Sequence, residues 1–177
     1  QAESQSDENG KGESQGDQSK IPAEVLETIV KELLEEVREG LIELDFHDGS
    51  VIIRIREHGS FSSGGADVNS SFVPVIDRIG AVLERLEGPI TVSGHTDNVP
   101  ARGDRFRSNW DLSALRSASV AHELLAASAI EPWRLSVMGK ADTEPLADNS
   151  TVAGRARNRR VEISINLNKD PGLRPVF

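Results

Sequence analysis

The apolar positions of this chain follow two repeats, one helical and one that alternates along extended runs. In residues 22–38 the apolar side chains recur at steps of one and three, as on one face of a helix, and the same spacing recurs in residues 69–87 and 111–128. Glutamates cover the other face of the first of these segments. We therefore predict three long helices, and a fourth, short helix over residues 151–157.

Extended apolar runs lie between the predicted helices. Residues 41–46 and 51–56 flank Asp48-Gly49, a pair typical of a tight turn, and this pattern predicts a β-hairpin. Three further strands are predicted, at residues 90–93, 134–138 and 161–167. Strands that alternate with helices favour an α/β or α+β architecture, in which helices pack on one mixed sheet.

The two ends of the chain differ from its middle. Residues 1–20 contain five acids, two lysines and a single apolar side chain, Ala2, so they cannot bury enough surface to offset their ordering entropy. We predict a disordered acidic linker there, although the composition fits a free tail with no role equally well. The helix within residues 21–40 is expected to pack on its own domain, with self-pairing or partner binding as the alternative. The domain is then expected over residues 41–168, followed by a tail over residues 169–177.

Composition excludes several classes of protein. The 177 residues fit one domain with an appendage, and the absence of cysteine excludes a disulfide scaffold, a zinc ribbon and a thiol nucleophile. The net charge of −9 argues against binding to nucleic acid or to an anionic membrane. No apolar run approaches the roughly 20 residues that cross a bilayer, and no signal-peptide pattern opens the chain. We expect a protein that is soluble as it stands or whose anchor lies outside this sequence.

Two opposite charges form the most informative chemical feature. Asp97 follows the strand predicted at residues 90–93, and Arg116 lies one to two turns into the next helix, whose start Ser108 and its neighbours are suited to cap. Taken singly, Asp97 is consistent with a turn residue, and Arg116 is consistent with a surface ion pair that contributes little to stability. Together they can hold a ligand that carries both an ammonium and a carboxylate, because a guanidinium binds a carboxylate through parallel hydrogen bonds. This pair favours binding over catalysis.

Other chemical features have weaker interpretations. His95 and Asp97 share a strand side and would suit a metal-dependent hydrolase, but no third ligand is evident, so we predict neither an enzyme nor a cofactor. Trp110 and Trp133 are interpreted as core or loop anchors. Four arginines crowd one short segment and are interpreted as internal ion pairs or as a surface for an anionic glycan: Arg155, Arg157, Arg159 and Arg160.

Several ordered motifs, from about residue 44 to residue 167, carry a family resemblance. They are Gly94-His-Thr-Asp-Asn, Asn109-x-x-Leu112-Ser113-x-x-Arg116, Gly139-x-Ala-Asp, Pro145-Leu, Asn149-x-Thr, Gly154-Arg155 and Asn158-Arg-Arg-Val-Glu-Ile163. In these motifs the chain resembles the OmpA-like peptidoglycan-binding domain. The resemblance implies an α+β fold, a β-α-β-α-β arrangement in which helices are layered on a mixed sheet. It also implies a ligand, the diaminopimelate residue of a peptidoglycan stem peptide, whose free end offers an ammonium and a carboxylate.

The resemblance also implies roles for individual residues. Asp97 aligns with the family's carboxylate and Arg116 with its guanidinium. Four further residues match positions that line the pocket in relatives: Phe61, Thr96, Asn109 and Leu112. Ser117 stands where relatives often have alanine, a change between two small residues.

A narrower resemblance involves Phe61-x-Ser-Gly-x-Ala-Asp67, the long loop over residues 98–109, and Phe106-x-Ser-Asn-Trp-Asp-Leu-Ser113. These features resemble the flagellar motor stator B subunits of the MotB/PomB type. The resemblance implies the periplasmic part of a bacterial inner-membrane protein, a homodimer that anchors ion-driven torque to the cell wall. Its partner would be a stator A subunit, reached through a transmembrane segment that is not in this sequence, and the helix at residues 22–38 would help to control when the stator extends. The alternative is an OmpA-like envelope anchor unrelated to motility.

Overall fold

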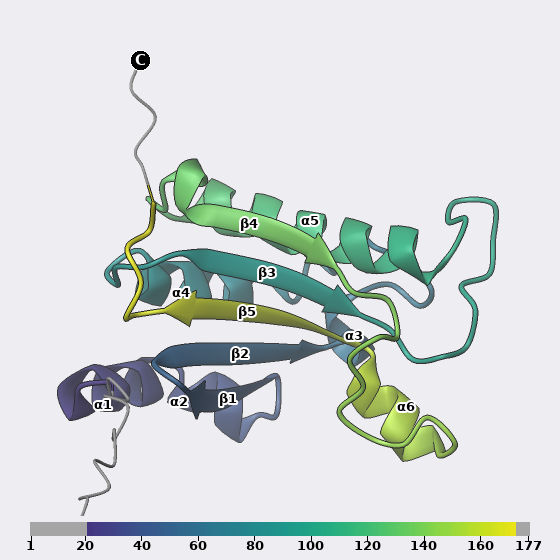
Figure 1. The fold of residues 1–177 in the computed structure, drawn as a ribbon, viewed down its shortest axis with the longest axis horizontal. Helices are drawn as coiled ribbons and strands as arrows, with labels where there is room; N and C mark the ends of the chain where they lie inside the picture. Colours follow the sequence, from purple (N-terminus) through teal and green to yellow (C-terminus); the bar gives the residue numbers. More distant parts are fainter. Residues whose placement is uncertain (1–20, 173–177) are drawn as a thin grey trace, which may run out of the picture.

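The computed structural model describes residues 21–172, so the linker predicted over residues 1–20 and the last part of the predicted tail lie outside the described residues. Within that part of the chain, five strands form one mixed sheet in the order β1-β2-β5-β3-β4 (Figure 1). Their bounds are β1 Ile42–His47, β2 Ser50–Arg56, β3 Ile90–His95, β4 Leu135–Gly139 and β5 Arg160–Asn166. Strand β5 is antiparallel to both β2 and β3, and β4 is parallel to β3. The predicted α+β fold with a mixed sheet is confirmed.

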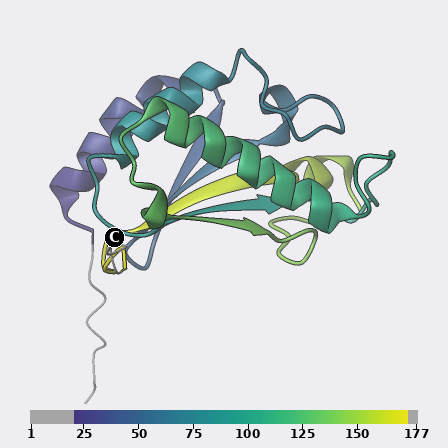
Figure 2. The same ribbon diagram turned by 90° about the horizontal axis from the view of Figure 1, so that it is seen from above.

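The helices gather on one side of the sheet. Seen nearly along the sheet, α1, α4 and α5 lie over the same face (Figure 2). The bounds are α1 Ala23–Glu32, α2 Leu34–Arg38, α3 Glu57–Ser60, α4 Val73–Leu83, α5 Asn109–Ala127 and α6 Val152–Asn158, with a 3₁₀ turn at Pro132–Arg134. The short helix α6 lies beyond the end of β2 and the start of β5 (Figure 1).

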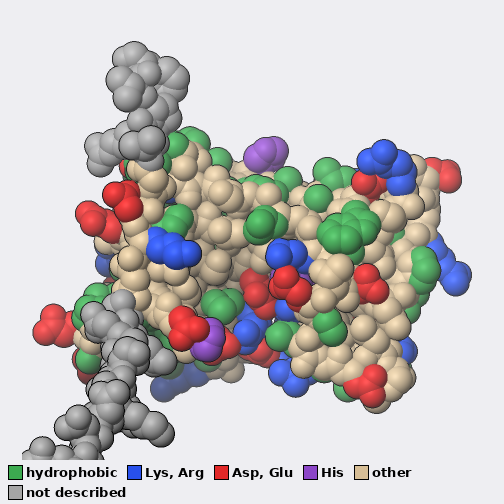
Figure 3. Space-filling view, viewed as in Figure 1, with side chains coloured by type: hydrophobic (Ala, Val, Ile, Leu, Met, Phe, Trp, Pro, Cys, Tyr) green, Lys and Arg blue, Asp and Glu red, His purple; other side chains and the backbone are tan. Residues whose placement is uncertain are grey.

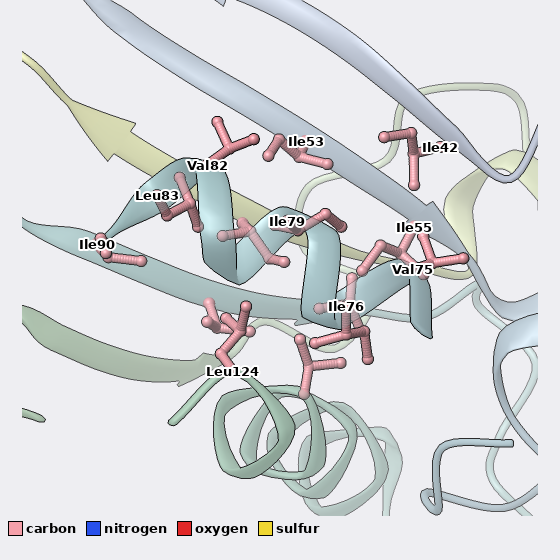
Figure 4. Close-up of a cluster of buried hydrophobic side chains, with 14 of the residues drawn as sticks. Ile42, Ile53, Ile55, Val75, Ile76, Ile79, Val82, Leu83, Ile90 and Leu124 are labelled. Carbon is pink, nitrogen blue, oxygen red and sulfur yellow. The ribbon is translucent and has the colours of Figure 1, made fainter. Parts of the chain in front are cut away.

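The hydrophobic core lies between this sheet face and the helices. Alternate residues of β2 and β5 are buried there, because successive side chains of a strand point to opposite faces. They meet Ile76, Ile79 and Leu83 of α4 and Leu124 of α5, each at most 1% exposed (Figure 4). Burial of each such side chain contributes about 1.5–3 kcal/mol, so this core fixes the ends of the strands from which the loops leave.

The opposite face of the sheet carries charges instead. Arg54 Nη2 donates to Asp45 Oδ2 at 2.8 Å, and Arg54 Nε donates to Glu162 Oε1 at 3.1 Å. Arg160 Nε donates to the same Glu162 oxygen at 2.7 Å. We call these four side chains the sheet-face network. Acidic and basic side chains are visible side by side on this face of the molecule (Figure 3).

The predicted helix over residues 22–38 is interrupted. Leu33, with φ −108° and ψ 14°, leaves helical geometry and separates α1 from α2. Ile29 and Leu33 are nonetheless almost fully buried in the core, and Arg78 of α4 donates to Glu36 of α2 at 2.6 Å. The prediction that this segment packs on its own domain is therefore confirmed.

Other boundaries shift by a few residues. The helix predicted over residues 69–87 shortens to α4, which has a proline in its first turn. Helix α5 begins two residues earlier than predicted, because Ser108 caps it by accepting from the Trp110 backbone N–H at 3.2 Å. The hairpin turn is confirmed, since Asp48 and Gly49 both have positive φ, of 46° and 73°. Trp110 is 54% exposed, so its interpretation as a core residue was wrong.

Candidate functional site

A pocket of about 400 Å³ opens at the end of the sheet where β2 and β3 finish and β5 begins. Asp97 reaches it from the loop after β3, and Arg116 reaches it from the second turn of α5. The structure thus brings the two charges predicted from the sequence into one cavity. The remaining lining residues are Glu57, Gly64, Thr96, Val99, Pro100, Ala101, Arg102, Asn109, Leu112, Arg155 and Arg159.

Small residues let α5 lie close to the sheet beside this pocket. A Cβ placed on Gly94 of β3 would lie 2.0 Å from the Ser113 carbonyl oxygen, and a Cβ on Gly139 of β4 would lie 2.8 Å from the Ala114 Cβ. Ser117 Oγ donates to the Met138 carbonyl at 2.8 Å, which adds a link between α5 and β4. This close approach sets the height of Arg116 above the end of β3.

Asp97 is buried, with an exposed fraction of 6%, and several hydrogen bonds hold it in place. Its Oδ1 accepts from the Val99 backbone N–H at 2.9 Å, and its Oδ2 accepts from Arg159 Nη1 at 2.7 Å. Thr96 Oγ1 donates to the Asp97 carbonyl at 2.8 Å, and Asn109 Nδ2 donates to the Val99 carbonyl at 3.0 Å. Thr96 and Asn109 therefore hold the loop that presents the carboxylate.

Arg116 is held by the segment that follows β2. The residue is 2% exposed; its Nε donates to the Gly65 carbonyl at 2.8 Å, and its Nη1 donates to Glu57 Oε2 at 2.9 Å. The guanidinium carbon lies 5.4 Å from the centre of the Phe61 ring, a cation–π distance. Phe61 is itself buried and is not among the residues that line the pocket, so it supports Arg116 rather than forming the pocket wall.

Four charges of alternating sign form a chain through the pocket. Arg159 bridges the two acids, since its Nη1 bonds Asp97 and its Nε lies 3.1 Å from Glu57 Oε2. Glu57 in turn bonds Arg116. We call Asp97, Arg159, Glu57 and Arg116 the pocket network.

Sequence reasoning did not assign Glu57 or Arg159 to the site. The two come together because β2 and β5 pair in a register that sets Arg56 opposite Arg160, and the Glu57 N–H then donates to the Arg159 carbonyl at 3.0 Å. The cluster of arginines was a signal, and its interpretation as internal ion pairs holds for Arg159 and Arg160. The register between these two strands, which lie about a hundred residues apart, follows from no local sequence pattern.

The long loop over residues 98–108 is anchored at the pocket mouth. Phe106 packs with Ala66 and Leu112 in a small second apolar cluster, and the Ala101 N–H donates to Asn109 Oδ1 at 2.9 Å. Where the loop meets α5, two hydrogen bonds from the Arg107 side chain and one from its backbone lower the pKa of Asp111 to about 2. Leu112 and Asn109 thus both line the pocket and fasten its loop.

His95 and Asp97 do not form a common site. Strand β3 ends at His95, whose ring lies on the charged face of the sheet, 3.3 Å from Ser93 Oγ and 4.0 Å from Glu162 Oε2. Burial, aided by the positive charge of Arg160, lowers the pKa of His95 to about 4, so the ring is neutral at neutral pH. In residues 21–172, no three His, Cys, Asp or Glu side chains converge as metal ligands would. None of the helices in that range is long and apolar enough to cross a bilayer.

Comparison with known sequences identifies the family. A family model described as "OmpA family" matches residues 60–159, more than half of the chain. The chain belongs to the OmpA family. Motility protein B of Bacillus subtilis is 33% identical over 129 residues, which are 72% of this chain and 49% of that protein. The chain therefore spans about half the length of this curated relative.

Solved structures agree with this OmpA-family assignment. A MotB-like protein from Desulfovibrio vulgaris has 31% identity and a TM-score of 0.75, over 82% of this chain and 93% of that one. The cell wall anchor of the type VI secretion system of Pseudomonas aeruginosa has 34% identity and a TM-score of 0.73, over 78% and 96%. The resemblance to MotB-type OmpA-like domains is confirmed, and these comparisons indicate no enzyme family.

Proposed function

We propose that this chain is a non-catalytic domain that binds peptidoglycan. Asp97 accepts hydrogen bonds from the ammonium of a diaminopimelate residue, and Arg116 donates to the carboxylate at the same end of that residue. One observation carries the proposal: in a chain of the OmpA family, these two opposite charges line a single pocket of about 400 Å³. Thr96, Asn109 and Leu112 are proposed to form the wall around the ligand, with Phe61 as the support of Arg116.

The charges of Asp97 and Arg116 suit weak, reversible binding of the ligand. Each hydrogen bond to a charged group contributes on the order of 1.5–3 kcal/mol, from which the costs of association are subtracted. A single site of this kind binds weakly, and two such sites on one continuous mesh gain avidity. We therefore propose that the protein acts as a homodimer, and that the wall holds it through both copies.

For the whole protein we propose the role of a flagellar stator B subunit. The domain would lie in the periplasm, and a transmembrane segment outside this sequence would pair with a stator A subunit, so that ion-driven torque is exerted against the wall. The similarity to Motility protein B supports this role. The long loop over residues 98–108 closes one side of the pocket. It also supports the proposed role, because its sequence resembles that of stator B subunits.

A second function is an envelope anchor unrelated to motility. It is favoured by the similarity to the type VI secretion anchor, which is as high as the similarity to the MotB-like protein. To separate the two, residues 21–172 would replace the matching part of Motility protein B of Bacillus subtilis. Restored swimming supports the stator role, whereas a chimera that binds the wall without restoring swimming supports the alternative.

Retention on purified sacculi tests wall binding itself. Asp97→Asn keeps the shape of the side chain and an oxygen for the Val99 N–H, but it removes the charge that holds the ammonium. We expect retention to fall by roughly tenfold or more, the loss of one charge-assisted contact. The matched control is Asp45→Asn, which removes an ion-paired aspartate from the sheet-face network and should leave retention unchanged.

The nature of the sacculus sharpens this test. Peptidoglycan with lysine in place of diaminopimelate lacks the carboxylate assigned to Arg116, so wild-type protein should be retained less on lysine-type sacculi than on diaminopimelate-type sacculi. If folded Asp97→Asn protein is retained as well as wild type, the proposed function is wrong.

A further inference from the structure

The proposed function places the ligand's ammonium at Asp97 and its carboxylate at Arg116. Each of these two side chains is already paired within the protein with a group of the same charge as the ligand group that it would bind. Arg159 Nη1 lies 2.7 Å from Asp97 Oδ2, where the ligand's ammonium would bind. Glu57 Oε2 lies 2.9 Å from Arg116 Nη1, where the ligand's carboxylate would bind. The free protein therefore fills its own site with one cation and one anion.

The two ligand-binding groups do not depend on these partners for their position. Asp97 is also held through its other oxygen, by the Val99 N–H. Arg116 is also held through its Nε, by the Gly65 carbonyl, and by the ring of Phe61. Loss of the internal partners leaves both groups aimed at the pocket.

The internal partners can leave together. Arg159 Nε lies 3.1 Å from Glu57 Oε2, so the two remain paired when each gives up its other contact. The Arg159 side chain is 34% exposed, against 3% for Arg116, so it has room to turn toward solvent. Glu57 is 18% exposed and follows the end of β2 directly. The more accessible side chains of the pocket network are thus the ones that would move.

We propose that Glu57 and Arg159 are a displaceable pair of internal counterions, and that a zwitterionic ligand binds by exchanging with them. The ammonium replaces Arg159 at Asp97, and the carboxylate replaces Glu57 at Arg116. Before binding, the network has three contacts between opposite charges, namely Asp97–Arg159, Arg159–Glu57 and Glu57–Arg116. After binding there are again three, two to the ligand and one between the displaced partners. This inference rests on the proposed function.

Competition of this kind weakens the ligand's apparent affinity. Removal of both competitors, as Glu57→Gln with Arg159→Gln, keeps the net charge of the pocket and frees both binding groups. We expect the dissociation constant for a diaminopimelate-containing muropeptide to fall by roughly three- to tenfold, because two charge-assisted contacts no longer have to be broken.

The single variants separate the two halves of the exchange. Glu57→Gln frees Arg116 and adds net positive charge, so it should strengthen the binding of pimelate, which has two carboxylates and no ammonium. Arg159→Gln removes positive charge and should weaken pimelate binding. Opposite signs for the two variants support the exchange, and equal changes contradict it.

The test is calorimetric titration of the full chain with the muropeptide. The matched control is the double variant Glu43→Gln with Arg56→Gln. It removes the ion pair between Glu43 and Arg56, the neighbour of Glu57 in sequence, and neither residue lines the pocket. The affinity of this variant for the muropeptide should equal that of wild type. If wild type binds and Asp97→Asn does not, but removal of Glu57 and Arg159 leaves affinity equal or weaker, the exchange is wrong and the proposed function stands. If wild type fails to bind, both are wrong.

A ligand-bound structure of the wild type decides the matter if the double variant does not fold. Separation of Arg159 from Asp97, with Arg159 still on Glu57, supports the exchange. An unbroken Asp97–Arg159 contact beside the bound ligand overturns it.

Discussion

The pocket network and the sheet-face network are built from the same side chains, two acids and two arginines in alternating order. In the sheet-face network every member lies on a strand, and the hollow beside Arg54 and Arg160 has a volume of only about 10 Å³, which is about one water molecule. In the pocket network the members lie at strand ends, on a loop and on α5, around about 400 Å³. Similar charge chemistry therefore serves packing in one place and encloses a cavity in the other.

The two networks differ in the geometry of the backbone that carries them. A strand fixes the direction of its side chains at every second residue, so the sheet-face charges point at one another and leave room for only about one water molecule. The loop after β3 and the start of α5 instead hold Asp97 and Arg116 apart, and longer side chains bridge the distance. Arg159 and Arg160 are neighbours in the sequence and belong to different networks, so they allow a direct comparison.

The largest expected effect comes from these neighbouring arginines. Arg160 is 4% exposed and donates to Glu162 and to the carbonyls of Asn158 and Glu144. Arg160→Gln leaves those partners without their ion pair and hydrogen bonds. It should lower the free energy of unfolding by about 3–5 kcal/mol, the range for breaking a buried ion pair. Arg159 is one-third exposed, so Arg159→Gln should cost about 1 kcal/mol or less. Urea denaturation measures the free energy of unfolding of both variants. Equal losses of stability would contradict the distinction drawn between the two networks.

A smaller effect is expected from His95, which faces Arg160, Glu162, Glu144 and Lys140. Its pKa falls from 6.5 to about 4 on folding, so the unfolded chain takes up the proton first as the pH drops. The stability due to the neutral ring is complete above pH 6.5, is lost as the pH falls toward 4, and changes no further below that. The loss should be on the order of 3 kcal/mol.

His95→Gln should flatten this slope in the free energy of unfolding between pH 6.5 and pH 4. The exposed His122 provides the control, since His122→Gln should keep the wild-type slope. A slope that survives His95→Gln would assign the pH dependence to other groups. Glu162 interacts with His95, and its pKa is lowered from 4.5, so its own contribution to stability is lost only as the pH falls below that value.

The third prediction concerns the contact that sets the distance between the charges of the pocket. Gly94→Ala places a methyl group 2.0 Å from the Ser113 carbonyl, so α5 has to move away from β3. We expect a loss of about 1–3 kcal/mol in stability, with a fall in muropeptide affinity because Arg116 moves with the helix. Thr91→Ala, on the opposite face of the same strand, should cost under about 1 kcal/mol and leave affinity unchanged. Unchanged affinity in folded Gly94→Ala protein would show that the spacing is not required.

The periodic parts of the fold followed from the sequence alone. The hairpin around Asp48-Gly49 and the start of α5 near Ser108 depend on local chemistry, and both lie within two residues of their predicted places. The break at Leu33 was not predicted, because the apolar spacing continues through it without interruption. Trp110 was misplaced because a tryptophan's size favours burial on average, whereas its position on α5 turns it outward.

The site was predictable only in part, for a related reason. Asp97 and Arg116 are close in sequence and flank one loop, so their approach to a common pocket could be inferred from a strand, a loop and a helix. Glu57 and Arg159 meet only through the pairing of β2 with β5, a long-range register that depends on the whole sheet. The role of Phe61 under Arg116 likewise depends on how the segment after β2 folds back.

The central claim is that Asp97 and Arg116 hold the two charges of one diaminopimelate end, in exchange for Arg159 and Glu57. A crystal structure with a diaminopimelate-containing muropeptide tests this most directly. We predict the ammonium at Asp97 Oδ2, the carboxylate at the Arg116 guanidinium, and Arg159 paired with Glu57 alone. A muropeptide bound elsewhere, with the Asp97–Arg159 and Glu57–Arg116 contacts intact, would contradict the claim.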